Sequence, residues 1–186
     1  MKIGVSGVRG SFSEQAGRQY AASVGVREPE MAYLTSVEGV LSALDAGSIE
    51  RGVFPVENST GGIVIEAVYA MAKHLFDVET MFELEIHQNL LVKPGTKAEH
   101  ITRVVSHDQA LKQCRMYLKR KWPGIDMEEY PDTAKAAQDL ANGVLKDSDA
   151  VIASKNCAEM YGLDLLEESI QDLKYNFTNF VVAKKG

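Results

Sequence analysis

Glycines, hydroxyl residues and amides gather in four short segments of this 186-residue chain. Each follows a short apolar stretch and precedes a helical pattern; they are Ser6–Ser11, Glu57–Gly62, Ser106–Gln109 and Pro131–Ala134. In parallel sheets, ligands bind beyond the carboxyl ends of strands, where helix N-termini present free N–H groups. One such segment more often only caps a helix or closes a turn. Four of them together predict a site for a small anion, built mostly from neutral donors.

Several standard site motifs are missing from the chain. The segment Gly4–Gly10 lacks the G-x-G-x-x-G spacing, and the second predicted strand ends in Thr35 rather than an acidic residue, which argues against a dinucleotide site. Ser59 does not lie in a G-x-S-x-G elbow, so serine-hydrolase chemistry has no support. The histidines show no metal-ligand spacing. These patterns favour a site that needs neither cofactor nor metal.

Composition narrows the class of protein. The chain is 45% hydrophobic and 25% charged, as in globular proteins, and its net charge of −6 argues against binding a phosphate backbone. No apolar run approaches the roughly 18 residues of a membrane helix. The N-terminal segment is typical of a strand rather than a signal peptide, and Cys114 and Cys157 are too few for a disulfide scaffold. We expect a soluble, cytoplasmic protein without nucleic-acid or membrane partners.

Strand and helix patterns alternate along the chain, which is typical of parallel βαβ units. The predicted strands are Lys2–Ser6, Met31–Thr35, Gly52–Val56, Arg103–Val105, Met127–Tyr130, Asp149–Ala153 and Thr178–Ala183. The predicted helices are Ser13–Ala22, Ser36–Ala46, Ile63–Leu75, Gln109–Lys119, Thr133–Asn142 and Asn156–Tyr161. Capping boxes that start at Ser11, Thr35 and Ser106 mark three helix starts, and Gly162 fits a left-handed cap after the last helix.

The segment Met81–Val92 breaks this alternation. Its apolar and polar residues alternate over twelve positions, which is long for a strand. We interpret it as one strand that leaves a first lobe and enters a second. The predicted fold is therefore α/β, with two α/β lobes and a cleft between them, one lobe at 1–80 and the other at 81–186. The second lobe includes the strand at 81–92 and the C-terminal strand with Thr178, which we expect to pack against the hinge.

Six ordered motifs resemble the catalytic domain of prephenate dehydratase, over essentially the whole chain. Gly7–Ser13 resembles the family's G-P-x-G-[ST]-[FY]-[ST] start, and Pro55–Gly62 its P-[IV]-E-N-S-x-x-G turn. Ser106–Cys114 is similar to S-H-x-Q-A-L-x-Q-C. The remaining matches are Glu83–Leu90 with the hinge strand, Ala153–Ala158 with A-I-A-S…A, and Ile170–Phe180 with I-x-D…N-x-T-R-F.

The resemblance implies two lobes like those of type II periplasmic binding proteins, and it implies that the protein forms a homodimer. It implies cofactor-independent conversion of prephenate to phenylpyruvate in phenylalanine biosynthesis, with loss of water and carbon dioxide. Thr178 is then the catalytic residue, donating a hydrogen bond to the leaving hydroxyl. The candidate substrate-binding residues are Arg9, Gly10, Ser11, Glu57, Asn58, Ser59, Thr60, Gly61, Ser106, His107, Gln109, Thr133, Ala134, Asn176, Asn179 and Phe180.

One position departs from the family pattern. The family has Arg after the catalytic Thr, and this chain has Asn179. Arg makes bidentate, charged contacts with carboxylates that Asn cannot make, although Arg9 offers a replacement charge. Dehydratase activity on prephenate is the favoured interpretation. Arogenate dehydratase, a non-aromatising prephenate decarboxylase and a non-catalytic carboxylate-binding module stay open as alternatives. Family members also usually carry a C-terminal regulatory ACT domain, which this sequence does not include.

Overall fold

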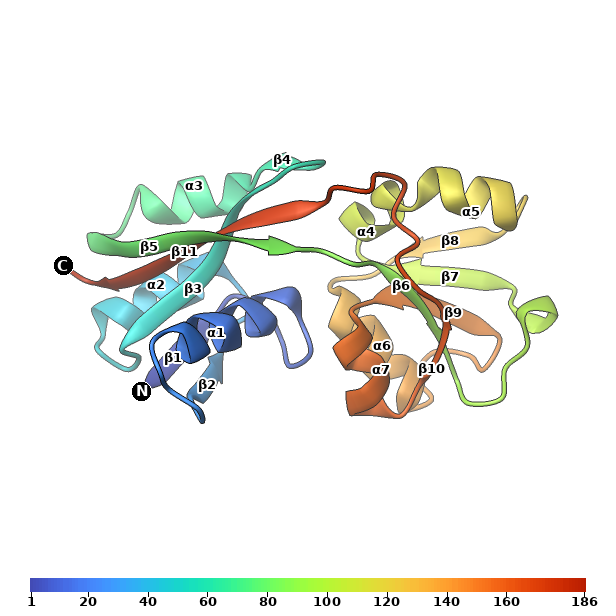
Figure 1. The fold of residues 1–186 in the computed structure, drawn as a ribbon, viewed down its shortest axis with the longest axis horizontal. Coiled ribbons are helices and arrows are strands. Elements are labelled where there is room, and N and C mark those ends of the chain that lie inside the picture. Colours follow the sequence, from blue (N-terminus) through green and yellow to red (C-terminus); the bar gives the residue numbers. More distant parts are fainter. The chain divides into compact units, whose positions relative to one another are not determined.

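The computed structural model describes residues 1–186, which form two α/β units, each with its own sheet (Figure 1). Unit 1 comprises residues 1–85 and 177–186, and unit 2 comprises residues 86–176. The chain therefore passes into unit 2 after Glu85 and returns to unit 1 at Phe177. The two α/β units that the strand and helix patterns predict are present, but their boundaries differ from the predicted ones.

Unit 1 contains a six-stranded mixed sheet with the order β2-β1-β3-β11-β5, in which β4 pairs with β3. The strands are β1 (Lys2–Val5), β2 (Glu30–Tyr33), β3 (Arg51–Asn58), β4 (Gly62–Ile63), β5 (Phe76–Glu85) and β11 (Phe177–Lys185). The helices are α1 (Phe12–Ser23), α2 (Val37–Asp45) and α3 (Ile65–Met71). β1 runs parallel to β2 and β3, whereas β11 runs antiparallel to β3 and β5.

The core of unit 1 forms where α2 and α3 pack on the sheet. Val40 and Leu41 of α2 are completely buried with Ala67 of α3, Phe54 of β3 and Ala183 of β11. Burial of each of the larger side chains stabilises the folded state by about 1.5–3 kcal/mol. This packing holds β3 and β11 side by side, and both strands carry candidate site residues.

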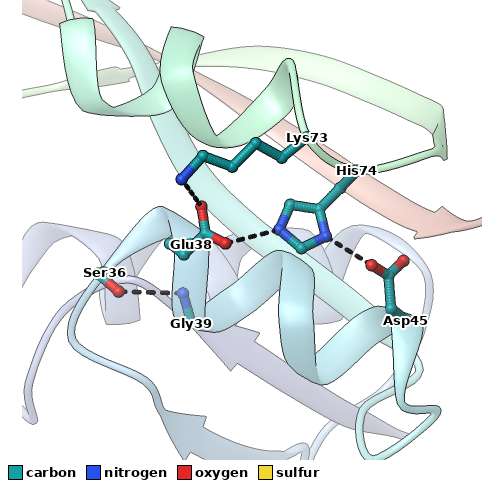
Figure 2. A network of polar contacts seen from close by, with 6 residues as sticks. All are labelled: Ser36, Glu38, Gly39, Asp45, Lys73 and His74. Carbon is teal, nitrogen blue, oxygen red and sulfur yellow. Dashed lines mark hydrogen bonds and ion pairs between the residues drawn. The ribbon is translucent and has the colours of Figure 1, made fainter.

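An ion-paired histidine links the end of α3 to α2 (Figure 2). Nδ1 of His74 lies 2.5 Å from Asp45 Oδ2, and its Nε2 lies 2.9 Å from Glu38 Oε1. Lys73 adds a second cation to Glu38 at 3.2 Å. The hydrogen bonds with Asp45 and Glu38 raise the pKa of His74 above its ordinary value. His74, which its sequence context suggests to be an ordinary surface residue, therefore links α2 to the segment after α3 through hydrogen bonds to Asp45 and Glu38.

Unit 2 contains a five-stranded sheet with the order β10-β6-β9-β7-β8. The strands are β6 (Asn89–Val92), β7 (Arg103–Ser106), β8 (Asp126–Glu129), β9 (Asp149–Ala153) and β10 (Asp164–Glu167). The helices are η1 (Ala98–His100), α4 (Asp108–Gln113), α5 (Arg115–Lys121), α6 (Thr133–Ala141) and α7 (Lys155–Tyr161). β7 is parallel to β8 and β9, and β6 is antiparallel to β9 and β10. Its core includes Leu90, Val104, Cys114, Leu118 and Ile152.

The single strand predicted at Met81–Val92 is wrong, because the segment forms the end of β5 and the whole of β6 in two different sheets. Between them the backbone bonds to a loop instead of a sheet. Ile86 N donates to Asn176 O at 2.7 Å, and Gln88 O accepts from Ile170 N at 2.8 Å. The alternation of apolar and polar residues breaks at this crossing, where His87, Gln88 and Asn89 are polar in succession.

The C-terminal strand also differs from its predicted place in the second lobe. β11 lies between β3 and β5 in the sheet of unit 1, with Thr178 opposite both Asn58 and Leu84. Both of its edges are thus paired over most of its length, and Val181 and Ala183 join the unit 1 core. Thr178 accordingly belongs to the same unit as the Glu57–Gly62 turn.

Two predicted helices differ in extent. The helix predicted at Ile63–Leu75 spans only Ile65–Met71, because β4 occupies its start and β5 begins at Phe76. The helix predicted at Gln109–Lys119 divides at Cys114 into α4 and α5. The Asp172 carboxylate accepts hydrogen bonds from the N–H groups of Met116 and Tyr117 at 2.8 and 2.7 Å. These bonds satisfy donors at the start of a new helix, which explains the break.

Helix caps agree only partly with the predicted ones. Ser11 caps α1 as expected, with Oγ accepting from Glu14 N at 3.3 Å. α2 begins one residue later than the predicted box, because Ser36 rather than Thr35 supplies the capping oxygen. Gly162 ends α7 with φ of +66°, the left-handed conformation that the sequence predicts. None of the helices combines the length and the apolar character needed to cross a membrane.

Candidate functional site

Thr178 receives a hydrogen bond from Asn58 across the β3–β11 pair. The two residues lie directly opposite each other, and Asn58 Nδ2 lies 2.9 Å from Thr178 Oγ1. The same nitrogen donates to Phe177 O at 3.1 Å. Thr178 is 8% exposed, so its hydroxyl is nearly buried in the sheet. Asn58 thereby fixes the side chain that the family resemblance makes catalytic.

The contacts of the Asn58 oxygen fix the direction of this bond. Oδ1 accepts from Thr60 N at 3.0 Å, from Thr60 Oγ1 at 2.7 Å and from Gly61 N at 2.9 Å. Backbone N–H groups can only donate, so the amide cannot be flipped. Thr178 Oγ1 is therefore an acceptor toward Asn58, and no other group accepts the Thr178 proton in the structure. Its O–H stays free to donate to a ligand.

Ser59 attaches the start of β11 to the same turn. Its N–H donates to Phe177 O at 2.8 Å, and its hydroxyl accepts from Phe177 N at 3.0 Å. The structure thus brings together Asn58, Ser59, Thr60, Gly61 and Thr178 of the predicted set. The donors of Thr60 and Gly61 point into the turn itself, so these residues shape the site instead of offering their N–H groups outward.

Asn179 and Glu57 lie on the other face of the sheet from Thr178. Successive strand residues point to opposite faces, and Asn179 is in register with Glu57 on β3 and Glu83 on β5. Its Nδ2 lies 3.4 Å from Glu57 Oε2. An Arg at this position would have two carboxylate neighbours. Phe180 is 1% exposed and stacks on Phe82 with ring centroids 6.2 Å apart, which makes it part of the core.

The first turn is organised by a buried carboxylate. Glu14 Oε2 accepts from Gly10 N at 2.6 Å, and Oε1 accepts from Arg18 and Tyr33. Burial would raise the pKa of Glu14, but the hydrogen bonds from Gly10, Tyr33 and Arg18 outweigh it and lower that pKa. The Gly10 N–H, expected to bind substrate, is therefore occupied by the protein's own anion. Ser11 caps the helix, and Arg9 is exposed on the turn.

In unit 2, His107 supplies the helix cap that the sequence predicts at Ser106. Ser106 is completely buried, and its hydroxyl donates to Ile152 O at 2.6 Å. The predicted cap at Ser106 is therefore wrong; His107 caps α4, with Nδ1 accepting from Gln109 N at 3.2 Å. Ser106 links β7 to β9, and the exposed His107 begins the helix.

Some of the other predicted site residues of unit 2 have donors that are bonded within the protein, and others do not. Asp132 caps α6 by accepting from Ala134 N at 2.7 Å, so the Ala134 N–H is occupied. The side chains of Gln109 and Thr133 are half-buried and make no hydrogen bond in the structure. Asn176 is 1% exposed and donates to Gln113 Oε1 at 2.9 Å.

Sequence reasoning missed Glu14 and Gln113 as residues that organise the candidate site. Glu14 lies in the capping box that starts at Ser11, and Gln113 lies in the Ser106–Cys114 motif, but their types suggested a helix start and a helix interior. The expectation that all four turns line one cleft stays a prediction. No group of three or more His, Cys, Asp or Glu side chains is placed to hold a metal ion.

Comparison with protein families finds one match, to the family model described as prephenate dehydratase, over residues 3–186. Arogenate dehydratase 1 of Petunia hybrida is 35% identical over 186 residues, covering all of this chain and 42% of the relative. A bifunctional chorismate mutase/prephenate dehydratase of Stutzerimonas stutzeri is 32% identical over 182 residues, covering 98% of this chain and 48% of the relative. The chain thus spans less than half the length of these relatives.

Solved structures confirm the fold class. The prephenate dehydratase of Arthrobacter aurescens in complex with L-Phe has a TM-score of 0.89 and 26% identity, covering all of this chain and 61% of that one. A nutrient binding protein from Burkholderia cenocepacia, bound to methionine, has a TM-score of 0.53 and 14% identity, covering all of this chain and 84% of that one. The second likeness concerns the fold alone, and it agrees with the predicted similarity to periplasmic binding proteins.

Proposed function

Because the chain belongs to the prephenate dehydratase family, we propose that it converts prephenate to phenylpyruvate, carbon dioxide and water. The observation that carries the proposal is the one-way hydrogen bond from Asn58 to Thr178, which leaves the Thr178 O–H as a donor. The reaction breaks the bond between the ring and its carboxylate. That electron pair makes the ring aromatic, and the 4-hydroxyl departs as hydroxide, which takes a proton from the solvent to become water.

Thr178 stabilises the departing oxygen without surrendering its own proton. A threonine hydroxyl hardly ionises near neutral pH, so it acts by a hydrogen bond that strengthens as negative charge develops on the oxygen. Asn58 supports this role, because its amide occupies the acceptor side of the hydroxyl. Preorganised donors of this kind need no rearrangement during the reaction.

Prephenate is a dicarboxylate, so the site also needs donors for two carboxylates. Gln109 and Thr133 keep their predicted role, because their side chains form no bond within the protein. Arg9 supplies the positive charge that Asn179 does not provide. Gly10, Thr60, Gly61 and Ala134 act through the shape of their turns, since their N–H groups are bonded internally.

Arogenate is the second candidate substrate, and the relatives favour it. The relatives named arogenate dehydratase reach 35% identity, slightly above the bifunctional prephenate enzymes at 31–32%. Arogenate carries an amino group where prephenate carries a keto group, and it loses the same water and carbon dioxide from its ring. The same hydrogen bond from Thr178 would therefore serve both substrates.

A homodimer is part of the proposal. The segment from β4 to β5 of unit 1 exposes large hydrophobic side chains at its surface, namely Ile63, Ile65, Val68, Tyr69, Leu75, Val78 and Met81. Such a surface supports association with a second copy. Sedimentation that gives a monomer at micromolar concentration would contradict it. The cytoplasmic location and the lack of nucleic-acid and membrane partners stay predictions.

The test is a product balance with each substrate. Incubation with prephenate is followed for phenylpyruvate and carbon dioxide, and incubation with arogenate for phenylalanine and carbon dioxide. Equal amounts of aromatic product and carbon dioxide support the proposal. Carbon dioxide without an aromatic product would identify a decarboxylase. Binding measured by calorimetry without any turnover would identify a carboxylate-binding module.

A further inference from the structure

Three buried side-chain amides form a cluster in unit 2, near the residues where the chain enters and leaves it. Gln113 is the last residue of α4, Gln88 precedes β6, and Asn176 directly precedes β11. Their exposed fractions are 9%, 4% and 1%. Gln113 Oε1 accepts from Gln88 Nε2 at 3.0 Å and from Asn176 Nδ2 at 2.9 Å. Gln113 Oε1 therefore binds both the segment that enters unit 2, at Gln88, and the segment that leaves it, at Asn176.

Backbone bonds reinforce the cluster on the side of Asn176. Ile86 N donates to Asn176 O at 2.7 Å, and Asp172 N donates to Gln113 O at 2.7 Å. Asn176 is thus fixed by both its side chain and its carbonyl. A buried amide that loses its hydrogen-bond partner costs the full free energy of its desolvation. The cluster therefore favours this one arrangement of its three side chains.

A single residue, Phe177, separates this anchored position from Thr178. Phe177 follows Asn176 and is bonded through both N–H and C=O to Ser59. Thr178 comes next. Consecutive Cα atoms lie about 3.8 Å apart, so anchoring Asn176 restricts where the start of β11 and Thr178 can lie. Misplacement of a reacting group by about 1 Å can cost roughly a hundredfold in rate.

We propose that Gln113 is a positioning residue for Thr178, acting through its hydrogen bond to Asn176. The proposal rests on the proposed function for the role of Thr178. The bond to Gln88 goes to the other crossing segment, which reaches Thr178 less directly, through its pairing with Leu84 on β5. Gln113 and Gln88 therefore offer a matched comparison within one buried cluster.

The test compares Gln113→Met, Asn176→Ala and Gln88→Met in the full chain. Gln113→Met removes the shared acceptor, Asn176→Ala removes the Asn176–Gln113 bond, and Gln88→Met removes the Gln88–Gln113 bond. We expect the first two to lower kcat at least about tenfold with little change in KM, and Gln88→Met to keep kcat within about twofold at similar loss of stability. Gln113→Glu keeps acceptor oxygens and should recover most of kcat.

Hydrogen exchange supplies a readout that does not depend on turnover. The N–H groups of Ser59 and Phe177 bond across the start of β11, so their exchange reports its attachment. Asn176→Ala should speed their exchange about tenfold or more relative to Gln88→Met. Equal exchange and equal kcat in the two variants would overturn the proposal. If the unmodified protein turns over neither substrate, the proposed function fails, while the exchange comparison still decides whether the cluster positions this strand.

Discussion

Asn58 on β3 donates a hydrogen bond to Thr178 on β11 over 2.9 Å, although 120 positions separate them in the chain. Three donors converge on the Asn58 oxygen and prevent the amide from reversing. The direction of the bond therefore comes from the turn after β3. Thr178 is left with its proton as the group it can offer to a ligand.

Asn58→Asp tests that direction. The substitution replaces the donating nitrogen with an oxygen, which would accept the Thr178 proton and turn it away from substrate. Losing one donor to a developing negative charge costs about 10²–10³ in kcat, so we expect a fall of about a hundredfold with KM nearly constant. Steady-state kinetics on a variant with an unchanged circular dichroism spectrum provides the measurement. Wild-type kcat in this variant would show that the direction of the bond does not matter.

Asn179→Arg tests whether this position, on the face of the sheet away from Thr178, contacts the substrate. Since Asn179 lies between Glu57 and Glu83 in register, we expect an Arg there to pair with these carboxylates and leave substrate binding unchanged. Exposed pairs contribute about 0.2–1 kcal/mol and weaken in salt, so the free energy of unfolding should rise slightly at low ionic strength.

Urea unfolding of the Asn179→Arg variant, with and without added Glu57→Gln, measures this pairing. A KM about tenfold lower, without a gain in stability, would instead mean that the position contacts a substrate carboxylate, as the family resemblance implies.

Ser106→Ala separates stability from catalysis in unit 2. The buried hydroxyl donates to Ile152 O, and its loss leaves that carbonyl without this partner. We expect the free energy of unfolding to fall by about 1–3 kcal/mol, with kcat and KM close to wild type. Denaturant unfolding and kinetics on the same preparation check both parts. A large rise in KM with an unchanged free energy of unfolding would mean that Ser106 contacts the substrate.

The His74 network predicts a pH dependence of stability (Figure 2). Hydrogen bonds with Asp45 and Glu38 raise the pKa of His74 in the folded state, so the protonated form is stabilised by folding. This contribution is complete below the unfolded pKa of about 6.5 and is lost as the pH rises through the higher folded value.

His74→Gln should therefore lose more stability at about pH 6 than at about pH 9, relative to wild type. Unfolding free energies of both proteins at the two pH values give the comparison. A difference that stays constant with pH would mean that the histidine is not charged in the folded protein.

Local features of the fold were predictable because local signals specify them. Ser11 and Glu14 mark the start of α1, and Gly162 ends α7 in the left-handed conformation. The division at Cys114 was not predictable, because the carboxylate that caps α5 belongs to Asp172, far along the chain. The placement of β11 in unit 1 likewise depends on pairing with β3 and β5, which no local pattern encodes.

For the candidate site, the sequence indicated which turns carry donors but not what each donor bonds. Hydroxyls and glycines in turns indicated a donor-rich site. Whether a donor faces a ligand depends on the nearest internal acceptor. Glu14 takes the Gly10 N–H, and Asp132 takes the Ala134 N–H. Strand alternation, visible only once the register is known, separates Asn179 from Thr178.

The most direct test of the account is kcat for aromatic product formation by Thr178→Val, beside Thr178→Ser, at saturating prephenate and at saturating arogenate. Valine keeps the shape of threonine and removes the donor, whereas serine keeps it. We predict that Thr178→Val lowers kcat by about a hundredfold or more with KM nearly unchanged, and that Thr178→Ser retains most of the activity. Thr178→Val that forms phenylpyruvate or phenylalanine at the wild-type rate would contradict the role of Thr178.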